Sequence, residues 1–184
     1  FFSHPDPTVK KKSGVLMPTI SSDNNLGNTF SIPYFYNISS NYDLTITPTF
    51  QTKADNYYTF NYRHLTKNHK FDIDTSITDN ESKAGTRNHM FINGDITNPY
   101  GKFDYKIETA NNDTYLRKNQ INEQTIFTSG LNFTKEMDNS FLDFSSYIYK
   151  HLDNSSEQKW EYIYPKINYD VYNYKDPISK TIWR

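Results

Sequence analysis

Five charged side chains stand at alternate positions of two apolar segments, and they are the first candidates for chemistry. They are Asp72, Asp74, Asp104, Lys106 and Glu108. Two carboxylates that share a face are the arrangement with which a glycosidase performs acid–base catalysis. However, carboxylates two residues apart on one strand are more commonly a solvated row than an acid–base couple. The sequence therefore favours hydration of a polar face over catalysis at Asp72 and Asp74.

Other reactive groups give no constellation that points to an enzyme. The chain has no Cys, which excludes a disulfide framework, a zinc–thiolate site and a cysteine nucleophile within it. The histidines are scattered without i, i+4 pairs, so no metal site is predicted; they are His4, His64, His69, His89 and His151. Neither a nucleophile elbow, nor a P-loop, nor a dinucleotide fingerprint is present. The sequence predicts a protein that is not an enzyme and needs no cofactor.

The elements that carry the charged side chains read as strands. In the segment 43–53, Leu44, Ile46, Pro48 and Phe50 alternate with threonines and other polar residues. This period of two indicates a strand with one apolar and one polar face. The same alternation returns in the segments 57–65, 71–79, 102–109 and 127–134. Short polar turns and longer Asn-rich connections follow these segments in alternation, which predicts hairpins and an antiparallel meander of roughly ten strands.

The composition agrees with an all-β fold and limits the partners. Aromatic residues make up 17% of the 184 residues, with 16 Tyr and 13 Phe, although hydrophobic residues are only 35%. A disordered chain of this polarity would be poor in aromatic residues. The net charge of −1 gives no basic field for a nucleic acid, so no nucleic-acid partner is predicted. The mean hydropathy is −0.86, and no apolar run approaches the ~18 residues of a membrane-spanning helix, which excludes such a helix but leaves a transmembrane β-barrel open.

The two faces of the predicted strands favour a membrane barrel over a soluble sandwich. A sandwich core is filled by Val, Leu and Ile; here Val is scarce, and Tyr, Phe and Ile share the apolar face with Thr. Aromatic-rich strands suit a lipid-facing band, and charged strand faces suit a water-filled lumen. A soluble β-sandwich that binds carbohydrate and a generic porin or receptor barrel remain as alternatives.

Segments in a fixed order carry a family resemblance. The stretch 2–18 contains the run Lys10, Lys11, Lys12, then Ser13, Gly14 and finally Pro18; the stretch 31–38 contains Pro33 before three aromatic residues; and the stretch 41–48 reads NYDLTITP. This series resembles the start of the barrel domain in the LPS-assembly outer-membrane protein family (LptD, also called OstA). The later stretches 113–117, DTYLR, and 164–169, YPKINY, resemble segments of the family's alphaproteobacterial branch. The resemblance implies part of a large transmembrane β-barrel in the cell outer membrane, with residues 1–12 as the junction from a periplasmic domain and residues 13–184 as a partial barrel.

The resemblance also implies a function without covalent chemistry. Members of the family insert lipopolysaccharide into the outer leaflet through a barrel lumen and a lateral gate. They receive it from a periplasmic bridge protein (LptA-like) and hold a lipoprotein plug (LptE-like) in the lumen. Pro18 and Pro33 match the gate prolines of the family, and proline weakens strand pairing because it has no N–H. Ordinary edge or bulge prolines are the alternative.

Further roles follow from the same resemblance. Gly14 is expected to serve the bend into the barrel. Lys10, Lys11 and Lys12 are expected either to meet lipid phosphates or to anchor the junction. The five charged residues introduced first are expected to face the lumen, where they keep it wet or contact sugar and phosphate groups.

Overall fold

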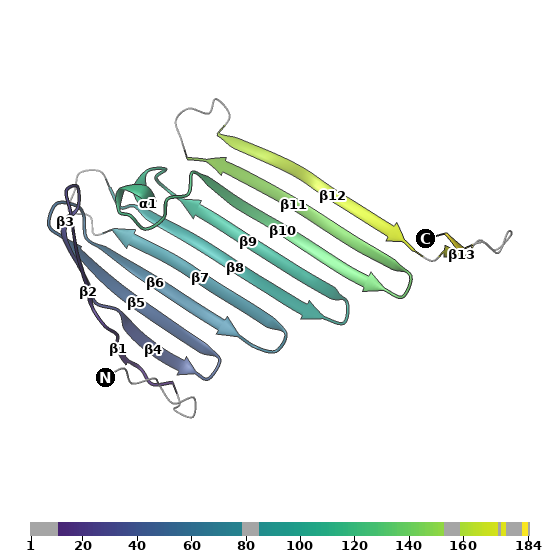
Figure 1. The fold of residues 1–184 in the computed structure, drawn as a ribbon, viewed down its shortest axis with the longest axis horizontal. Helices are drawn as coiled ribbons and strands as arrows, with labels where there is room; N and C mark the ends of the chain where they lie inside the picture. The colour runs from purple at the N-terminus through teal and green to yellow at the C-terminus, as the bar shows by residue number, and fades with distance from the viewer. Residues whose placement is uncertain (1–10, 79–84, 153–158, 173, 176–181, 184) are drawn as a thin grey trace.

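The described residues form an antiparallel meander with one short helical turn, followed by a separate two-stranded hairpin (Figure 1). The computed structural model describes residues 11–78, 85–152, 159–172, 174–175 and 182–183. The strands of the main sheet are β1 (Gly14–Val15), β2 (Thr19–Asp23), β3 (Gly27–Ser31), β4 (Tyr34–Ser39), β5 (Tyr42–Gln51), β6 (Tyr57–Leu65), β7 (His69–Thr78), β8 (Asn88–Asn98), β9 (Gly101–Ala110), β10 (Ile126–Met137), β11 (Ser140–His151) and β12 (Trp160–Val171). The helical turn α1 (Tyr115–Lys118) lies between β9 and β10, and β13 (Tyr174–Lys175) pairs with β14 (Ile182–Trp183) in a separate hairpin.

The predicted meander and its approximate strand number are confirmed. The main sheet contains twelve strand segments, and from β4 to β12 each pairs with the next along the chain. Because β1 and β2 both pair with the β3–β4 stretch, they are two halves of one interrupted edge strand. The halves β3 and β4 likewise share one register against β5. If each interrupted strand counts once, the sheet has ten strands.

Alternate side chains of the strands define two faces, as the period of two predicts. One face, here called the aromatic face, carries a row that crosses β5 to β9: Leu44, Tyr62, Ile73, Ile92 and Ile107. The opposite face, called the polar face, carries the neighbouring row: Asp43, Arg63, Asp72, Asn93 and Lys106. Each row consists of directly opposed residues, so the register fixes both faces.

The two ends of the sheet also differ. The connections 40–41, 66–68, 99–100 and 138–139 all lie at one end, called the short-turn end. The connections 52–56 and 111–125 lie at the other, the long-connection end, where β7 and β11 also end and β8 and β12 begin; residues 79–84 and 153–158 between those strands lie outside the described residues. The predicted alternation of short and long connections is therefore confirmed, whereas α1, within the connection 111–125, is a helical turn that the sequence pattern does not predict.

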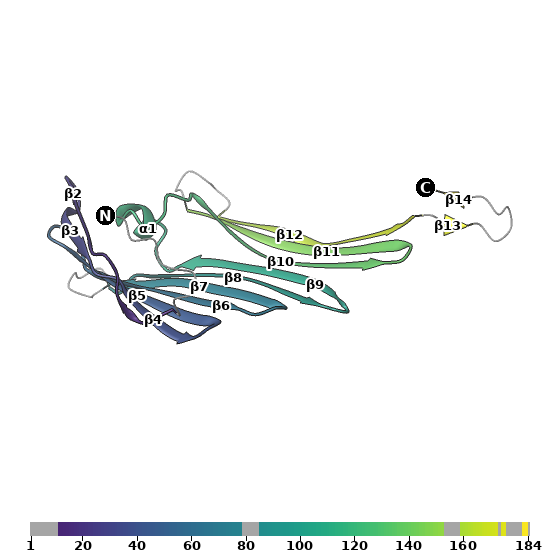
Figure 2. The same ribbon diagram turned by 60° about the horizontal axis from the view of Figure 1, so that its bottom comes forward.

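The described residues form one layer, and no second sheet covers the aromatic face (Figure 2). Large side chains on that face are exposed along the edge strand β12, with Tyr162 at 60% and Ile167 at 65%. A soluble sandwich requires a second sheet against such a face, so the sandwich alternative is not favoured. Within the described ranges, no helix has the length and apolar character needed to span a membrane.

Candidate functional site

The prolines predicted at the gate lie in breaks of the first two strands rather than inside them. Pro18 ends the stretch 16–18 between β1 and β2, and Pro33 ends the stretch 32–33 between β3 and β4. Val15 pairs with Tyr34, and Thr19 with Ser31, so three residues of the edge strand oppose two of its neighbour. This extra residue makes a bulge, as is common where proline interrupts an edge.

Each break leaves backbone pairs with one hydrogen bond where an antiparallel pair has two. The Leu16 N–H donates to the Pro33 carbonyl at 2.8 Å, but Pro33 has no N–H to return a bond to Leu16. The Ile32 N–H donates to the Pro48 carbonyl at 3.2 Å, and Pro48 cannot return that bond either. The pairing is thus weakened between the first and second strands and again between the second strand and β5.

Pro48 is a residue that the sequence analysis did not single out as part of this site. It lies inside the continuous strand β5 on the aromatic face, opposite Tyr58 of β6. A signal was available in the sequence: Pro18, Pro33 and Pro48 are separated by equal intervals, each close to the length of one strand and its turn. That spacing places the three prolines at one level of three successive strands.

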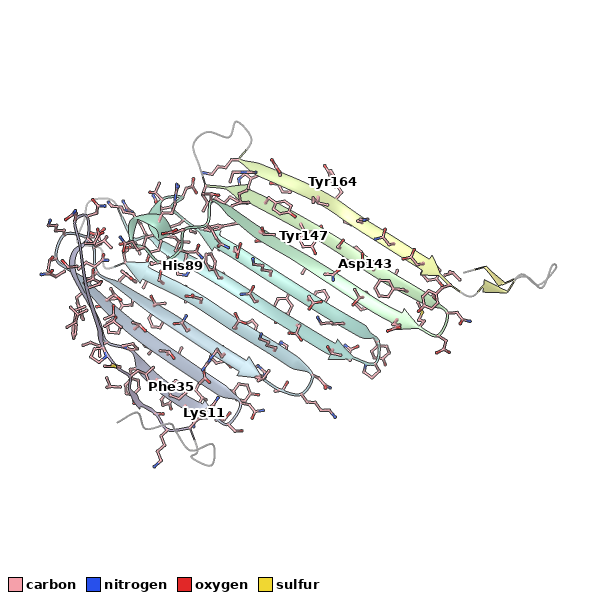
Figure 3. All side chains as sticks on the ribbon, viewed as in Figure 1. Lys11, Phe35, His89, Asp143, Tyr147 and Tyr164 are labelled. Atoms are coloured by element: carbon pink, nitrogen blue, oxygen red, sulfur yellow. The ribbon has the colours of Figure 1, made fainter. Side chains whose placement is uncertain are left out.

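The junction residues stand at the short-turn end. Lys10 lies outside the described residues, and Lys12 is exposed. Lys11 forms an ion pair with Asp43 at 3.2 Å, and Arg63 Nε donates to the other oxygen of the same carboxylate at 2.7 Å. Because Asp43 is only 3% exposed, this contact favours an anchoring role for Lys11 over a free lipid-phosphate contact. Figure 3 shows Lys11 beside the first strands at this end.

Gly14 pairs with Phe35 inside β1. A Cβ atom built at Gly14 would meet no atom within 4 Å. The site therefore has room for a side chain, and the predicted bend has no steric requirement for glycine.

The five charged residues predicted to face the lumen share the polar face. Asp72 lies in the row from Asp43 to Lys106, and Asn93 Nδ2 donates to its carboxylate at 3.1 Å. Asp74 belongs to the next row, and Glu108 to the same row two strands further on. Asp104 lies towards the short-turn end of β9, opposite Asp95 of β8. Most of these groups have a polar neighbour on an adjacent strand, which stabilises a sheet by cross-strand pairing.

Two Lys–carboxylate pairs on β9 have equal distances but different surroundings. Lys102 Nζ lies 2.7 Å from Asp104 Oδ1, and Lys106 Nζ lies 2.7 Å from Glu108 Oε1. The Asp104 side chain is 36% exposed, whereas that of Glu108 is 6% exposed. The Glu108 carboxylate also accepts from the Thr128 N–H of β10 at 2.7 Å.

Glu108 marks a seam within the sheet. Backbone pairing between β9 and β10 runs from Thr134 to Gly130 and stops there. Beyond that point, the Glu108 N–H donates to Ser129 Oγ at 3.0 Å, and the Glu108 side chain accepts from Thr128. Figure 2 shows β10 leaving the plane of β8 and β9 towards the long-connection end. Side chains thus replace a backbone ladder along this part of the sheet.

The seam corrects the predicted position of Phe127. Its alternation with Leu131 and Phe133 places all three on the aromatic face, but Phe127 packs edge-on against Phe91 with ring centroids 5.3 Å apart. Phe91 belongs to the polar face because it pairs with Asp74. Since β10 steps out of the plane, Phe127 lies over that face and is 1% exposed.

A row of polar contacts resembles a catalytic triad only in its residue types, which are Asp74, Ser76 and His89. Ser76 Oγ is 2.6 Å from His89 Nδ1 and 2.7 Å from the Tyr115 hydroxyl, and His89 Nε2 is 3.3 Å from Asp74 Oδ1. Ser76 is 1% exposed and His89 is 1% exposed. A nucleophile must reach its substrate, and the Ser76 hydroxyl is buried. These contacts therefore fit a structural role that joins β7, β8 and α1.

Two histidines that look scattered in the sequence lie together in the fold. His64 of β6 and His69 of β7 have ring centroids 4.9 Å apart, and His69 Nε2 is 3.2 Å from the Tyr105 hydroxyl. Each also lies against an aromatic ring: His64 against Tyr42 and His69 against Phe71. Among the described residues, no group of three or more His, Asp or Glu side chains is arranged to hold a metal ion.

The connection 111–125 is tied to β11 by an acidic side chain. Asp113 Oδ1 lies 2.9 Å from Lys150 Nζ, and Asp113 Oδ2 lies 2.6 Å from Lys159 Nζ. Partial burial raises the pKa of Asp113, but hydrogen bonds and charge attraction from Lys159 and Lys150 outweigh it and hold the pKa below 3.8. Burial also raises the pKa of the Tyr115 hydroxyl to about 12, so this group is neutral in its hydrogen bond with the Ser76 hydroxyl.

We expect this ion pair to give the connection an acid-sensitive contribution to stability. A carboxylate whose pKa falls on folding stabilises the native state above its unfolded pKa and loses that effect as the pH falls through its folded pKa. The Asp113→Asn variant should unfold at a lower temperature than the parent at pH 6, by the equivalent of about 1–2 kcal/mol. The difference should shrink once the pH falls below 3.8.

The measurement is the thermal unfolding midpoint of the full-length protein in detergent. The protein is heated at a series of pH values from pH 6 to pH 2.5, and the folded fraction is read from its electrophoretic mobility. Asp138→Asn is the matched control, because Asp138 is exposed in the 138–139 turn. A difference that stays constant over this pH range would contradict the assignment to Asp113.

Comparison with known proteins adds sequence similarity to this geometry. No protein-family model matches the chain. The LPS-assembly protein LptD of Pseudoalteromonas atlantica is 31% identical over 92 residues, 50% of this chain and 12% of its own length. The LptD of Bordetella pertussis is 30% identical over 116 residues, 59% of this chain and 14% of its own length. The LptD of Chromobacterium violaceum is 46% identical over 55 residues, 30% of this chain and 7% of its own length.

The matched part of the chain therefore spans at most 14% of the length of these relatives. They come from gamma- and betaproteobacteria rather than from the alphaproteobacterial branch. Their agreement in name and the all-β meander support the predicted resemblance, and the chain is similar in sequence to LPS-assembly proteins of the LptD family.

Proposed function

We propose that the chain is part of an outer-membrane β-barrel that inserts lipopolysaccharide into the outer leaflet. The observation that carries the proposal is that strand pairing is weakened at one position along three successive strands, where Pro18, Pro33 and Pro48 lie. The chain is also similar in sequence to LPS-assembly proteins. A lipid that leaves a barrel sideways must pass between two strands. Half-bonded pairs lower the free energy needed to part those strands, since each backbone hydrogen bond contributes about 1 kcal/mol.

The two faces support the same proposal. The aromatic face has the alternating Tyr, Phe and Ile that a lipid band requires, and the polar face has the charges of a water-filled lumen. In this arrangement Asp72, Asp74, Asp104, Lys106 and Glu108 keep the lumen hydrated along the path of the sugars. The chain acts by transport and not by catalysis. A generic porin or receptor barrel shares these faces but has no use for aligned prolines.

The finer parts of the proposal concern position and partners. The chain is the first part of the barrel domain, of alphaproteobacterial type, with residues 1–12 leading in from a periplasmic domain and residues 13–184 as part of the barrel. Gly14 stands at the bend into the barrel without a steric need for glycine there, and Lys10, Lys11 and Lys12 secure the junction. Lipopolysaccharide arrives from an LptA-like bridge, and an LptE-like lipoprotein occupies the lumen.

The test is photocrosslinking in cells from the full-length protein, with the photoreactive residue at position 17 or 32. Met17 is 88% exposed, and Ile32 lies at the level of Pro48 on the aromatic face. Ile77 is the matched control, because the register Pro48–Tyr58–Ile77 sets it at the same level, two strands away from Pro48. We expect crosslinks to lipopolysaccharide to be several times stronger at positions 17 and 32 than at 77.

A second arm of the test returns the missing donors. Pro33→Ala supplies an N–H that faces Leu16, and Pro48→Ala supplies one that faces Ile32. A gain of about 1 kcal/mol in pairing should reduce opening about fivefold and slow the appearance of new lipopolysaccharide at the surface. Equal crosslinking at all three positions, together with normal transport in both variants, would reject the gate.

A further inference from the structure

Two histidines of the aromatic face lie at the short-turn end, on either side of one hairpin turn. His64 stands near the end of β6, and His69 begins β7 directly after the turn 66–68. Both side chains are partly exposed, and their ring centroids are 4.9 Å apart. The turn between them carries Lys67, which is exposed. Three side chains with nitrogen donors therefore belong to the end of one hairpin.

Two tyrosines extend this group across the neighbouring strands. The ring centroids of Tyr42 in β5 and His64 are 4.4 Å apart, and the Tyr105 hydroxyl of β9 lies 3.2 Å from His69 Nε2. Tyr105 reaches β7 across β8 because the residue opposite it is Gly94, where a Cβ atom would overlap the Tyr105 ring. The four side chains are here called the histidine–tyrosine cluster: Tyr42, His64, His69 and Tyr105.

The charges of the surrounding face set this cluster apart. Along the described strands β5 to β9, the register places no Asp, Glu, Lys or Arg on the aromatic face. The two histidines are therefore the side chains of this face, on these strands, that can carry a positive charge. Asp72 and Asp95 of β7 and β8 belong to the polar face, on the other side of the sheet. Ionisable groups on a lipid-facing surface are costly without a partner, so the cluster favours an anion from outside the sheet.

We propose that the histidine–tyrosine cluster binds the phosphate of an anionic phospholipid in the inner leaflet of the outer membrane. The inference rests on the proposed function, because it takes the aromatic face as the lipid-facing surface and the short turns as the periplasmic end. Lipid head groups lie at the level where aromatic side chains gather at the membrane boundary. Imidazole N–H and tyrosine O–H groups donate to phosphate oxygens, and the Lys67 ammonium adds a positive charge in the adjoining turn.

The apolar part of the same face favours a lipid over a free phosphate ion. The row from Leu44 to Ile107 runs next to the cluster on the side away from the short turns. It offers a surface on which acyl chains can lie while the phosphate stays at the cluster. A free ion has no use for such a surface.

The test is native mass spectrometry of the purified full-length protein in detergent. The protein is titrated with phosphatidylglycerol or with diacylglycerol, which has the same chains and no phosphate. We expect the parent protein to retain phosphatidylglycerol at a concentration about tenfold lower than diacylglycerol, as charge-assisted hydrogen bonds require. The double variant His64→Phe/His69→Phe keeps an aromatic ring at each position and removes the donors, so it should lose this preference. His151→Phe is the matched control, because His151 lies 3.2 Å from Glu161 at the long-connection end, and it should keep the preference.

Tyr105→Phe is a second variant, which keeps the ring and removes only the hydroxyl beside His69. It should weaken retention of phosphatidylglycerol about threefold, and it decides the question if the double variant does not fold. Equal retention of the two lipids by the parent, or an unchanged preference in the folded variants, would overturn the site. Loss of the preference in excess inorganic phosphate would show a site for the free ion and would also overturn the lipid assignment. The proposed function fails separately, if positions 17 and 32 give no crosslinks to lipopolysaccharide while phosphatidylglycerol is still retained.

Discussion

Replacement of Glu108 by alanine is expected to destabilise the folded protein by about 1.5–3 kcal/mol, the range for hydrogen bonds to charged groups. The Glu108 carboxylate is 6% exposed and joins β9 to β10 where their backbone pairing has stopped. Its removal leaves the Thr128 N–H without its acceptor at 2.7 Å. A buried donor left without an acceptor destabilises the fold by more than a typical hydrogen bond contributes to stability.

The neighbouring pair provides the control. Asp104→Ala breaks an ion pair of the same 2.7 Å length, with a Lys on the same strand and face. Since both partners are at least 36% exposed, the loss should stay within about 0.5 kcal/mol. Glu108→Gln should fall between the two alanine variants, because an amide oxygen still accepts from Thr128 but carries no charge.

Two measurements on the full-length protein in detergent check this prediction. Urea unfolding gives the change in stability, and hydrogen exchange should show faster exchange of the Thr128 amide in Glu108→Ala than in Asp104→Ala. Equal effects of the two alanine variants would mean that burial of the Glu108 carboxylate does not control the seam.

The strands and their two faces could be predicted from the sequence, because both depend on the alternation of apolar and polar residues within each segment. Leu44 and Ile46 alternate with Thr45 and Thr47 whatever their partners are, so the pattern alone assigns each residue to a face. The same logic put Asp72, Asp74, Asp104, Lys106 and Glu108 on one face, where the register confirms them. It could not say which of them is buried, since Asp104 and Glu108 differ only through their neighbours on β10.

The features that the sequence did not predict depend on contacts between distant segments. The turn α1 is too short for a helical period, and Tyr115 is held by Ser76, 39 residues away. His64 and His69 meet because β6 and β7 are paired around a short turn. The displacement of Phe127 requires that pairing with β9 ends at Gly130, which no alternation in the segment 127–134 reveals.

Gly130→Ala is expected to destabilise the fold by about 1–3 kcal/mol, the usual cost of overpacking. A Cβ atom at position 130 would overlap the Tyr147 ring at Cδ1 and lie 2.9 Å from the Ser146 carbonyl oxygen. Tyr147 is directly opposite on β11 and covers the glycine on the polar face. The ring must swing away, and this disturbance falls at the last residue of β10 that is paired with β9.

A double-mutant cycle separates this clash from the loss of glycine itself. Tyr147→Ala removes the ring, so the double variant Gly130→Ala/Tyr147→Ala should lose less stability than the two single losses added together, by at least about 0.5 kcal/mol. Gly14→Ala is the steric control, because no atom lies within 4 Å of the added Cβ, and it should leave the urea midpoint unchanged. Additive losses would show that the ring does not meet the new methyl group, and the seam would then begin elsewhere than at Gly130. Coupling between positions 130 and 147, with no effect at position 14, would instead show that a glycine beneath an aromatic ring determines where β10 separates from β9. The same separation determines where the connection 111–125 can pack over the polar face.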